Sequence, residues 1–319
     1  MIQTMRLPTI SATRYRKLAD ISLALLALIV LTGAAVRLTG SGLGCPDWPK
    51  CYGRVIPPLE LHAWTEFGNR LLSGVVGFVV AAVSLLAWRR RPFRRNLALV
   101  GTLLPLGVLG QAVLGGFTVR SHLAPGFVMG HFGLSMVILA AAVALSWLAR
   151  HEPGSRPRSL DARGVWAVRG LLMWATVVLI AGAVTTASGP HAGGAGTGDV
   201  IPRFEFLGAD TLDSMIHWHG RSGTILGVAG VAVFLWLRRR GAPRDLLTAI
   251  GATCVLVAAQ GVVGGIQYLL HLPAELVWLH VAIATATWLT LLWAVAAAGR
   301  PREPHPPAPR TSEPVLTAH

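Results

Sequence analysis

Eight apolar stretches of about 20 residues recur along this chain, and few structures can accommodate them. About 20 apolar residues are what a helix needs to cross a bilayer, and its backbone polar groups must be satisfied within the segment. Only 13% of the residues are charged, about half the share found in soluble domains. We therefore predict an all-α polytopic membrane protein, with spans near 18–38, 64–87, 97–119, 128–149, 170–187, 214–237, 247–269 and 275–298.

The second half of the chain repeats the first. Gln111–His131 and Gln260–His280 each carry Gln, then Gly-Gly, then two histidines nine residues apart, and the second segment follows the first by 149 residues. Gly33-Ala34 and Gly182-Ala183 have the same spacing. Self-similarity at a fixed spacing indicates two copies of one structural unit. We therefore expect the eight transmembrane helices to form two four-helix bundles related by a pseudo-twofold axis.

Positive charge is concentrated in alternate connections between the apolar stretches. Most of the 28 Lys and Arg residues lie near the chain ends or in 88–96, 150–169 and 238–244. The positive-inside rule then predicts a multi-pass protein of the cell membrane with both termini in the cytoplasm. This distribution argues against nucleic-acid binding, which the net charge of +14 alone would suggest. The expected parts are a cytoplasmic arm (1–17), an N-terminal four-helix half (18–149), a cytoplasmic linker (150–169), a C-terminal four-helix half (170–298) and a disordered cytoplasmic tail (299–319).

Two of the three cysteines lie in the first outward loop. Cys45 and Cys51 belong to the segment GSGLGCPDWPKC, where Gly and Pro exclude a regular helix. A disulfide persists in an oxidising outer compartment, and it would fix this turn. We predict a Cys45–Cys51 disulfide, the alternative being two free thiols. Cys254 lies in an apolar stretch and is expected to be an inert core residue.

Polar side chains form a stripe on the second predicted span. His62, Glu66, Asn69 and Ser73 follow one another at intervals of four, three and four residues, so they share one helix face. Ionisable groups in a membrane helix are costly against lipid, and they usually face the bundle interior and mark function. The alternative is that His62 and Glu66 lie at the water interface and are merely solvated.

Two histidines in the second half are predicted to lie at similar depth on different helices. In the register of the repeat, His217 corresponds to Asn69 of the first half, and His280 corresponds to His131. His219 points about 200° away from His217 on a helix, so only one of them can serve a given pocket. Two imidazoles facing each other can ligate one haem iron, whereas zinc would need further ligands. The alternative for either ring is a hydrogen bond to a neighbouring helix.

The first half lacks such a pair. Asn69 stands where the second half has a histidine, and an amide oxygen is a poor iron ligand. His131 alone remains in register. An open coordination position beside the Glu66 carboxylate suits a substrate or O₂ better than an electron-transfer cofactor.

The chain resembles the haem A synthases, and within them the actinobacterial type. The resemblance rests on GSGLGCPDWPKC (Gly40–Cys51), EFGNR (Glu66–Arg70), the two Gln-x3-Gly-Gly…His segments and SGPHAG (Ser188–Gly193). It implies an eight-helix, haem-dependent membrane oxidoreductase. The family's reaction oxidises the C8 methyl group of haem O to a formyl group by successive hydroxylations, giving haem A for cytochrome oxidase.

The resemblance also implies roles for individual residues. The matching positions for a haem b cofactor are His217 and His280, and those for the substrate haem O are His131 and Asn69. Glu66 matches the family's essential carboxylate. The chain departs from the wider family at Asn69, where a histidine is common. His62 is a further candidate for the substrate-haem pocket. It lies about 10 Å further along the helix, so it cannot simply replace that ligand without moving the site.

The implied partners are haem O, haem O synthase, cytochrome oxidase assembly factors, membrane lipid and an electron donor that the sequence does not identify. Two other functions remain open from the residues. A diheme cytochrome b would carry two symmetric ligand pairs, which Asn69 contradicts. A transporter would have helix breaks near the membrane midplane, whereas these special residues lie near the outer helix ends.

Overall fold

The structure is a computed structural model that describes residues 9–153, 160–194 and 196–301. Within these ranges, eight long helices account for most of the chain, and each is long and apolar enough to cross a membrane. The predicted all-α fold of a multi-pass membrane protein is confirmed. The helices are α1 (Ala12–Leu38), α2 (Leu61–Trp88), α3 (Arg95–Arg120), α4 (Pro125–Arg150), α5 (Ala162–Ser188), α6 (Thr211–Arg239), α7 (Arg244–Leu269) and α8 (Ala274–Ala298).

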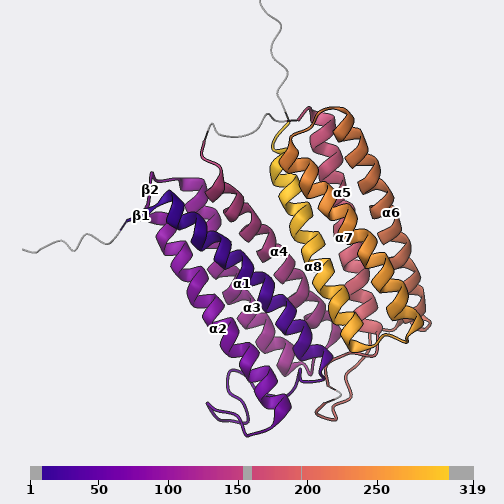
Figure 1. Cartoon of the computed structure of the whole chain (residues 1–319). Coiled ribbons are helices and arrows are strands. Elements are labelled where there is room, and N and C mark those ends of the chain that lie inside the picture. The colour runs from indigo at the N-terminus through magenta and orange to yellow at the C-terminus, as the bar shows by residue number, and fades with distance from the viewer. Residues whose placement is uncertain (1–8, 154–159, 195, 302–319) are drawn as a thin grey trace, which may run out of the picture.

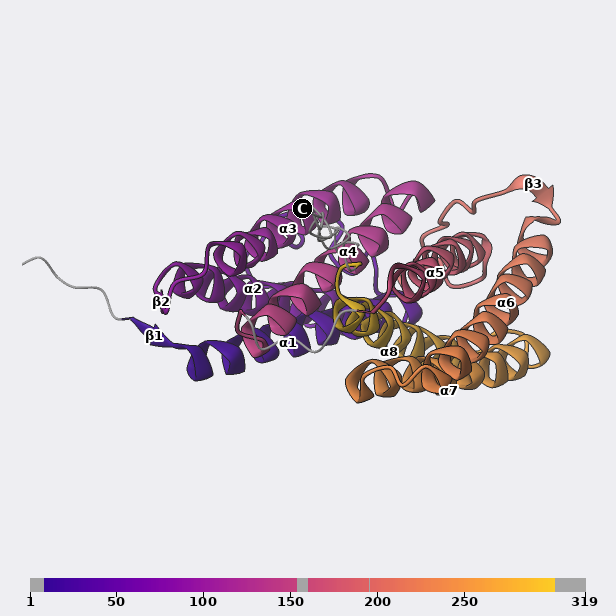
Figure 2. The ribbon, with the colours of Figure 1, turned by 90° about the horizontal axis from the view of Figure 1, so that it is seen from above.

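The helices form two bundles that lie side by side, α1–α4 in one and α5–α8 in the other (Figure 1). Seen along the bundle, α8 lies at the centre, where it packs against α1 and α4 as well as against its own α5 (Figure 2). Corresponding helices begin 149 or 150 residues apart along the chain. The two halves thus share one element order, while the pseudo-twofold axis stays a prediction.

The buried core runs across the contact between the halves. It includes Leu26 of α1, Leu139 of α4, Ala175 of α5 and Trp288 of α8. The indole N–H of Trp288 donates to the Met136 carbonyl oxygen at 3.0 Å, which ties α8 to α4. Large apolar side chains elsewhere on the helices are exposed, as expected of surfaces that face lipid chains.

The two ends of the bundle differ in composition. The connections α2–α3, α4–α5 and α6–α7 lie at one end with both ends of the described chain (Figure 1). We call this the arginine-rich end. There β1 (Ile10–Ser11) pairs in parallel with β2 (Arg90–Arg91), and buried Arg90 forms an ion pair with Glu152. The predicted arm, linker and tail lie partly outside the described residues.

The opposite end, which we call the loop end, carries the long loops 39–60 and 189–210. The second loop includes β3 (Phe206–Ala209). The short turns α3–α4 and α7–α8 close the same end, and they repeat each other in backbone conformation. His122 and Leu123 have positive φ angles of 51° and 57°, and His271 and Leu272 have 60° and 63°. Since non-glycine residues rarely adopt this conformation, its recurrence at a spacing of 149 residues extends the repeat to the backbone.

Candidate functional site

The repeated Gln-x3-Gly-Gly…His segments place a histidine ring against a glycine in each half. A Cβ atom built on Gly115 would lie 3.4 Å from Cε1 of His131, and one built on Gly264 would lie 3.3 Å from Cε1 of His280. Contacts this short are tight, so the first glycine of each pair lets the imidazole lie directly against the neighbouring helix. The Nδ1 atoms of both rings are buried and have no hydrogen-bond partner among the described residues.

In the second half, a third histidine faces His280. The ring centroids of His219 and His280 are 5.9 Å apart, with an angle of 60° between the planes. His219 lies against Gly182 of α5, where a Cβ atom would be 2.8 Å from its Cε1. Its Nδ1 is 3.1 Å from the Val178 carbonyl oxygen. A carbonyl oxygen only accepts, so Nδ1 carries the hydrogen and Nε2 keeps a free lone pair.

The His219–His280 pair suits a metal ion between the rings. Metal–imidazole distances of about 2 Å on each side would place the two centroids roughly 6 Å apart, close to the observed separation. Among the described residues, no group of three or more His, Cys, Asp or Glu side chains is arranged to hold a metal ion. A six-coordinate haem takes two protein ligands, because the porphyrin supplies the other four.

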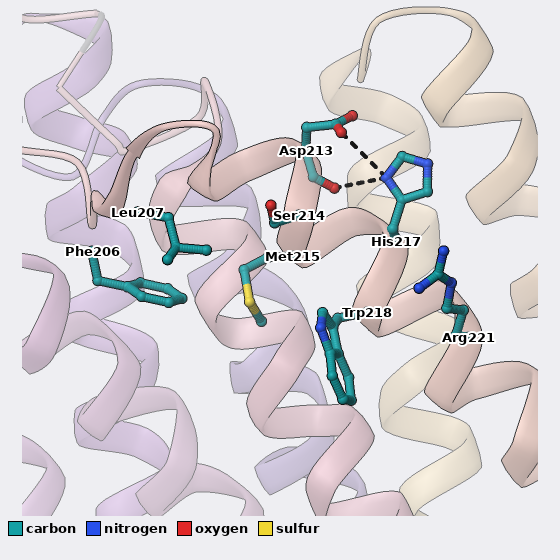
Figure 3. A pocket seen from close by; sticks show the side chains of 8 residues that line it. All are labelled: Phe206, Leu207, Asp213, Ser214, Met215, His217, Trp218 and Arg221. Atoms are coloured by element: carbon teal, nitrogen blue, oxygen red, sulfur yellow. Dashed lines mark hydrogen bonds and ion pairs between the residues drawn. The ribbon is translucent and has the colours of Figure 1, made fainter.

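His280 pairs with His219 and not with His217, which the repeat register selects. The His217 side chain is half exposed. Its Nδ1 lies 2.9 Å from the carbonyl oxygen of Asp213 and 3.4 Å from the carboxylate of that residue (Figure 3). The ring lies edge-on to Tyr268, 6.2 Å between centroids. His217 lines an open pocket of about 400 Å³ at the loop end of α6, with Phe206, Leu207, Asp213, Ser214, Met215, Trp218 and Arg221.

The register of the repeat shifts by one residue between α5 and α6, so the first-half spacing does not point directly to His219. Gly33 in α1 lies beside Asn69, where a Cβ atom would be 3.9 Å from Nδ2, as Gly182 lies beside His219. The sequence separation is 36 residues in the first pair and 37 in the second. The structural counterpart of Asn69 is therefore His219, one residue later than the glycine spacing alone would place it.

Asn69 and His131 of the first half are held by specific contacts. The Asn69 side-chain oxygen accepts a 2.7 Å hydrogen bond from the Thr32 hydroxyl, so the amide is tied to α1. The backbone carbonyl of His131 accepts from the Gln111 side chain at 2.9 Å, which links α3 to α4. His131 thus keeps the position of His280, while Asn69 keeps that of His219 without offering an imidazole.

Glu66 joins α2 to the first outward loop. It is buried, at 7% exposure, so it is not a solvated surface group. One carboxylate oxygen accepts from the backbone N–H of Cys45 at 2.7 Å, and the other accepts from the Arg70 guanidinium at 2.5 Å. Arg70 also donates to the carbonyl oxygens of Cys45, Asp47 and Lys50. The predicted Cys45–Cys51 disulfide is present in this loop.

His62 lies apart from Asn69 and His131. Its Nδ1 is 2.8 Å from the Ser41 hydroxyl, and the ring fills the space where a Cβ atom of Gly196 would be. Since Gly196 belongs to loop 189–210, a segment of the second half covers a residue of the first. The structure places His62 in the packing of the two loops, and its part in a substrate pocket stays a prediction.

The COX15-CtaA family, described as cytochrome oxidase assembly protein, matches residues 16–292. The chain belongs to the COX15-CtaA family. Its relatives include the heme A synthase of Halalkalibacterium halodurans, 26% identical over 287 residues that cover 86% of this chain and 94% of the relative.

Other matches are shorter. The heme A synthase of Lysinibacillus sphaericus is 32% identical over 154 residues, 48% of each protein. That of Bacillus pumilus is 28% identical over 175 residues, 53% of this chain and 57% of the relative. In these two matches the chain spans about half the length of the relative. The actinobacterial type remains a prediction for this COX15-CtaA protein.

The sequence did not predict the contacts that Arg70 and His219 make in this COX15-CtaA protein. Arg70 carried a detectable signal, because it stands four residues after Glu66, the spacing at which helix side chains pair. His219 carried the signal of its residue type only. Choosing between it and His217 required the position of α6 relative to α5, which the sequence does not specify.

Proposed function

We propose that this COX15-CtaA protein is a haem A synthase, which oxidises the C8 methyl group of haem O to a formyl group by successive hydroxylations. The product is haem A for cytochrome oxidase. The observation that carries the proposal is the His219–His280 pair, two imidazoles from different helices with one free Nε2 already oriented, in a family of cytochrome oxidase assembly proteins. The relative that aligns over most of its length bears the name heme A synthase.

The proposed cofactor is haem b, held by His219 and His280. Bound there, it supplies a one-electron redox centre within the membrane. Val178 fixes the tautomer of His219, and Gly182 and Gly264 leave the space that the two rings occupy. His217, tied to Asp213 and half exposed, has no part in this ligand set.

The proposed substrate site lies in the first half. His131 has the same glycine contact as His280 and is the candidate ligand for the iron of haem O. Asn69 is engaged by Thr32 and leaves the opposite axial position without an imidazole. Glu66 positions the disulfide loop over this half through Cys45 and Arg70. We assign it a positioning role in the oxidation, because both carboxylate oxygens are already bound.

The proposed location is the cell membrane, with the arginine-rich end and both termini in the cytoplasm. The concentration of arginine in the connections at that end supports this orientation. The loop end, with the disulfide, would then face the oxidising side. Haem O synthase, cytochrome oxidase assembly factors and an electron donor are the expected partners.

The test is haem extraction from cells that make haem O but lack a haem A synthase, with and without this chain. Mass analysis should find haem A only in cells that express it, and much less with the His280→Ala variant. A normal low-spin spectrum with haem O alone would instead indicate an electron-transfer cytochrome. Absence of both spectrum and haem A would overturn the proposal.

A further inference from the structure

Two arginines at the loop end have buried N–H groups with no acceptor among the residues that the structure describes. The atoms are Nε of Arg37, in the last turn of α1, and Nη1 of Arg203, in loop 189–210. No ion pair within the described residues includes either arginine. The two positive charges are also close enough to repel each other.

Both guanidinium groups are held in place by backbone carbonyls of the second half. Nη2 of Arg37 donates to the Thr186 carbonyl oxygen at 2.8 Å, and Nη2 of Arg203 donates to that of Pro190 at 2.7 Å. Gly193 packs against the Arg37 side chain, since a Cβ atom there would be 3.5 Å from its Cγ. Arg37 therefore crosses from the first half to the second, and its guanidinium is held in place there.

This arrangement lacks an anion. A buried charge without a partner is expensive, and a buried donor without an acceptor usually marks a missing water or ion. The carbonyls of Thr186 and Pro190 offer partial negative charge only. A carboxylate or a phosphate matches the planar donor geometry of guanidinium and balances its charge.

The position of the two arginines relates them to the histidine pair. Arg37 follows Gly33 by four residues, and Thr186 follows Gly182, the glycine beside His219, by four residues. Four residues of helix rise about 6 Å, so this anion position lies one turn outward from the His219 ring. A haem held by His219 and His280 would bring two propionate carboxylates, the kind of anion that these guanidinium groups match.

We propose that Arg37 and Arg203 together bind a haem propionate, one arginine from each half. This inference rests on the proposed function, in which His219 and His280 hold haem. The phosphate of an anionic lipid headgroup has the same chemistry and is the competing source of the anion.

The test titrates the full-length apoprotein with haem b and with haem b dimethyl ester, whose propionates are capped, following the low-spin absorption bands. The parent protein should bind the ester about tenfold or more weakly, as expected on losing charge-assisted hydrogen bonds. In Arg37→Gln and Arg203→Gln, haem b should fall to the affinity of the ester, and ester binding should not change. Arg54→Gln, an exposed arginine of loop 39–60, is the matched control and should behave as the parent.

The outcomes separate the inference from the proposed function. Equal binding of haem b and its ester to the parent, both low-spin, would overturn the inference and leave the proposed function intact. Phosphatidylglycerol retained by the parent in nanodiscs but lost from both arginine variants, with the two haems binding alike, would assign the site to lipid. Failure of both haem b and its ester to bind the parent would overturn the inference and the proposed function together. The ester comparison on the parent does not depend on the variants folding.

Discussion

At the scale of single residues, the absence of a Cβ atom determines where the imidazole rings lie. Gly115, Gly264 and Gly182 each leave room for one histidine ring on the adjacent helix. The space is tightest at Gly182, where a methyl group would be 2.8 Å from the ring of His219. The ligand geometry is therefore sensitive to substitutions at residues that carry no chemistry themselves.

Gly182→Ala should displace the His219 ring and weaken or abolish the low-spin haem spectrum. Overpacking of this kind costs about 1–3 kcal/mol, and here the cost falls on the ligand. Gly265→Ala is the control, because a Cβ atom there has nothing within 4 Å. The two variants are compared by the haem content and absorption spectrum of purified protein. An unchanged spectrum in Gly182→Ala would contradict the ring placement.

The two neighbouring histidines of α6 should behave differently on substitution. His219→Ala and His280→Ala are expected to lose the bis-imidazole spectrum, because each removes one side of the facing pair. His217→Ala should retain it, since that ring is hydrogen-bonded to the Asp213 carbonyl oxygen and His280 pairs with His219 instead. Electron paramagnetic resonance of the oxidised protein reports the axial ligands. Loss of the signal in His217→Ala, with retention in His219→Ala, would show that His217 is the ligand.

Glu66→Gln should lower haem A formation while leaving the His219–His280 haem in place. The substitution keeps the shape of the side chain but removes the charge that pairs with Arg70. If Glu66 acts by holding the loop, Arg70→Gln should cause a defect of similar size, with haem O accumulating in both. The measurement is haem A per protein. A deep defect in Glu66→Gln beside a normal Arg70→Gln would instead place the carboxylate at the reacting group.

At the scale of elements, much of the architecture follows from the sequence. Hydrophobic length alone located all eight helices, because the bilayer leaves few alternatives to a helix. The repeat placed His131 and His280 in register, and in the structure each ring lies against the first glycine of its own half's Gly-Gly pair. At α6 the repeat did not distinguish His217 from His219, because a shift of one residue rotates a side chain by a large angle around the helix axis. No motif marked Arg203, because its role depends on how loop 189–210 folds back on α5.

The effect of the disulfide in loop 39–60 can be tested directly. Replacing Cys45 and Cys51 together by serine should destabilise it locally by about 2–3 kcal/mol, since the unfolded loop gains entropy. Arg70 and Glu66 still hold one side, so the helices should remain intact. Limited proteolysis should cut the variant faster within 39–60, with unchanged helical circular dichroism. Equal digestion of parent and variant would show that the Glu66–Arg70 contacts suffice.

At the scale of the whole molecule, two similar halves differ in what they offer a haem. The second half presents two imidazoles, and the first presents one imidazole and an amide that Thr32 engages. The halves also meet through their outward loops. The Gly42 N–H donates to the Gly193 carbonyl at 2.8 Å, and the Gly196 N–H donates to that of Gly40 at 3.1 Å. The second half thus completes the covering of the first.

Because loop 189–210 covers part of the first half, that covering is synthesised later than the half it covers. A ribosome adds about 5–20 residues per second, so Gly193 follows Gly42 by on the order of ten seconds or more. During that interval the first half can already be inserted while His62 has no cover from 189–210. This uncovered period ends when loop 189–210 is made and packs against His62.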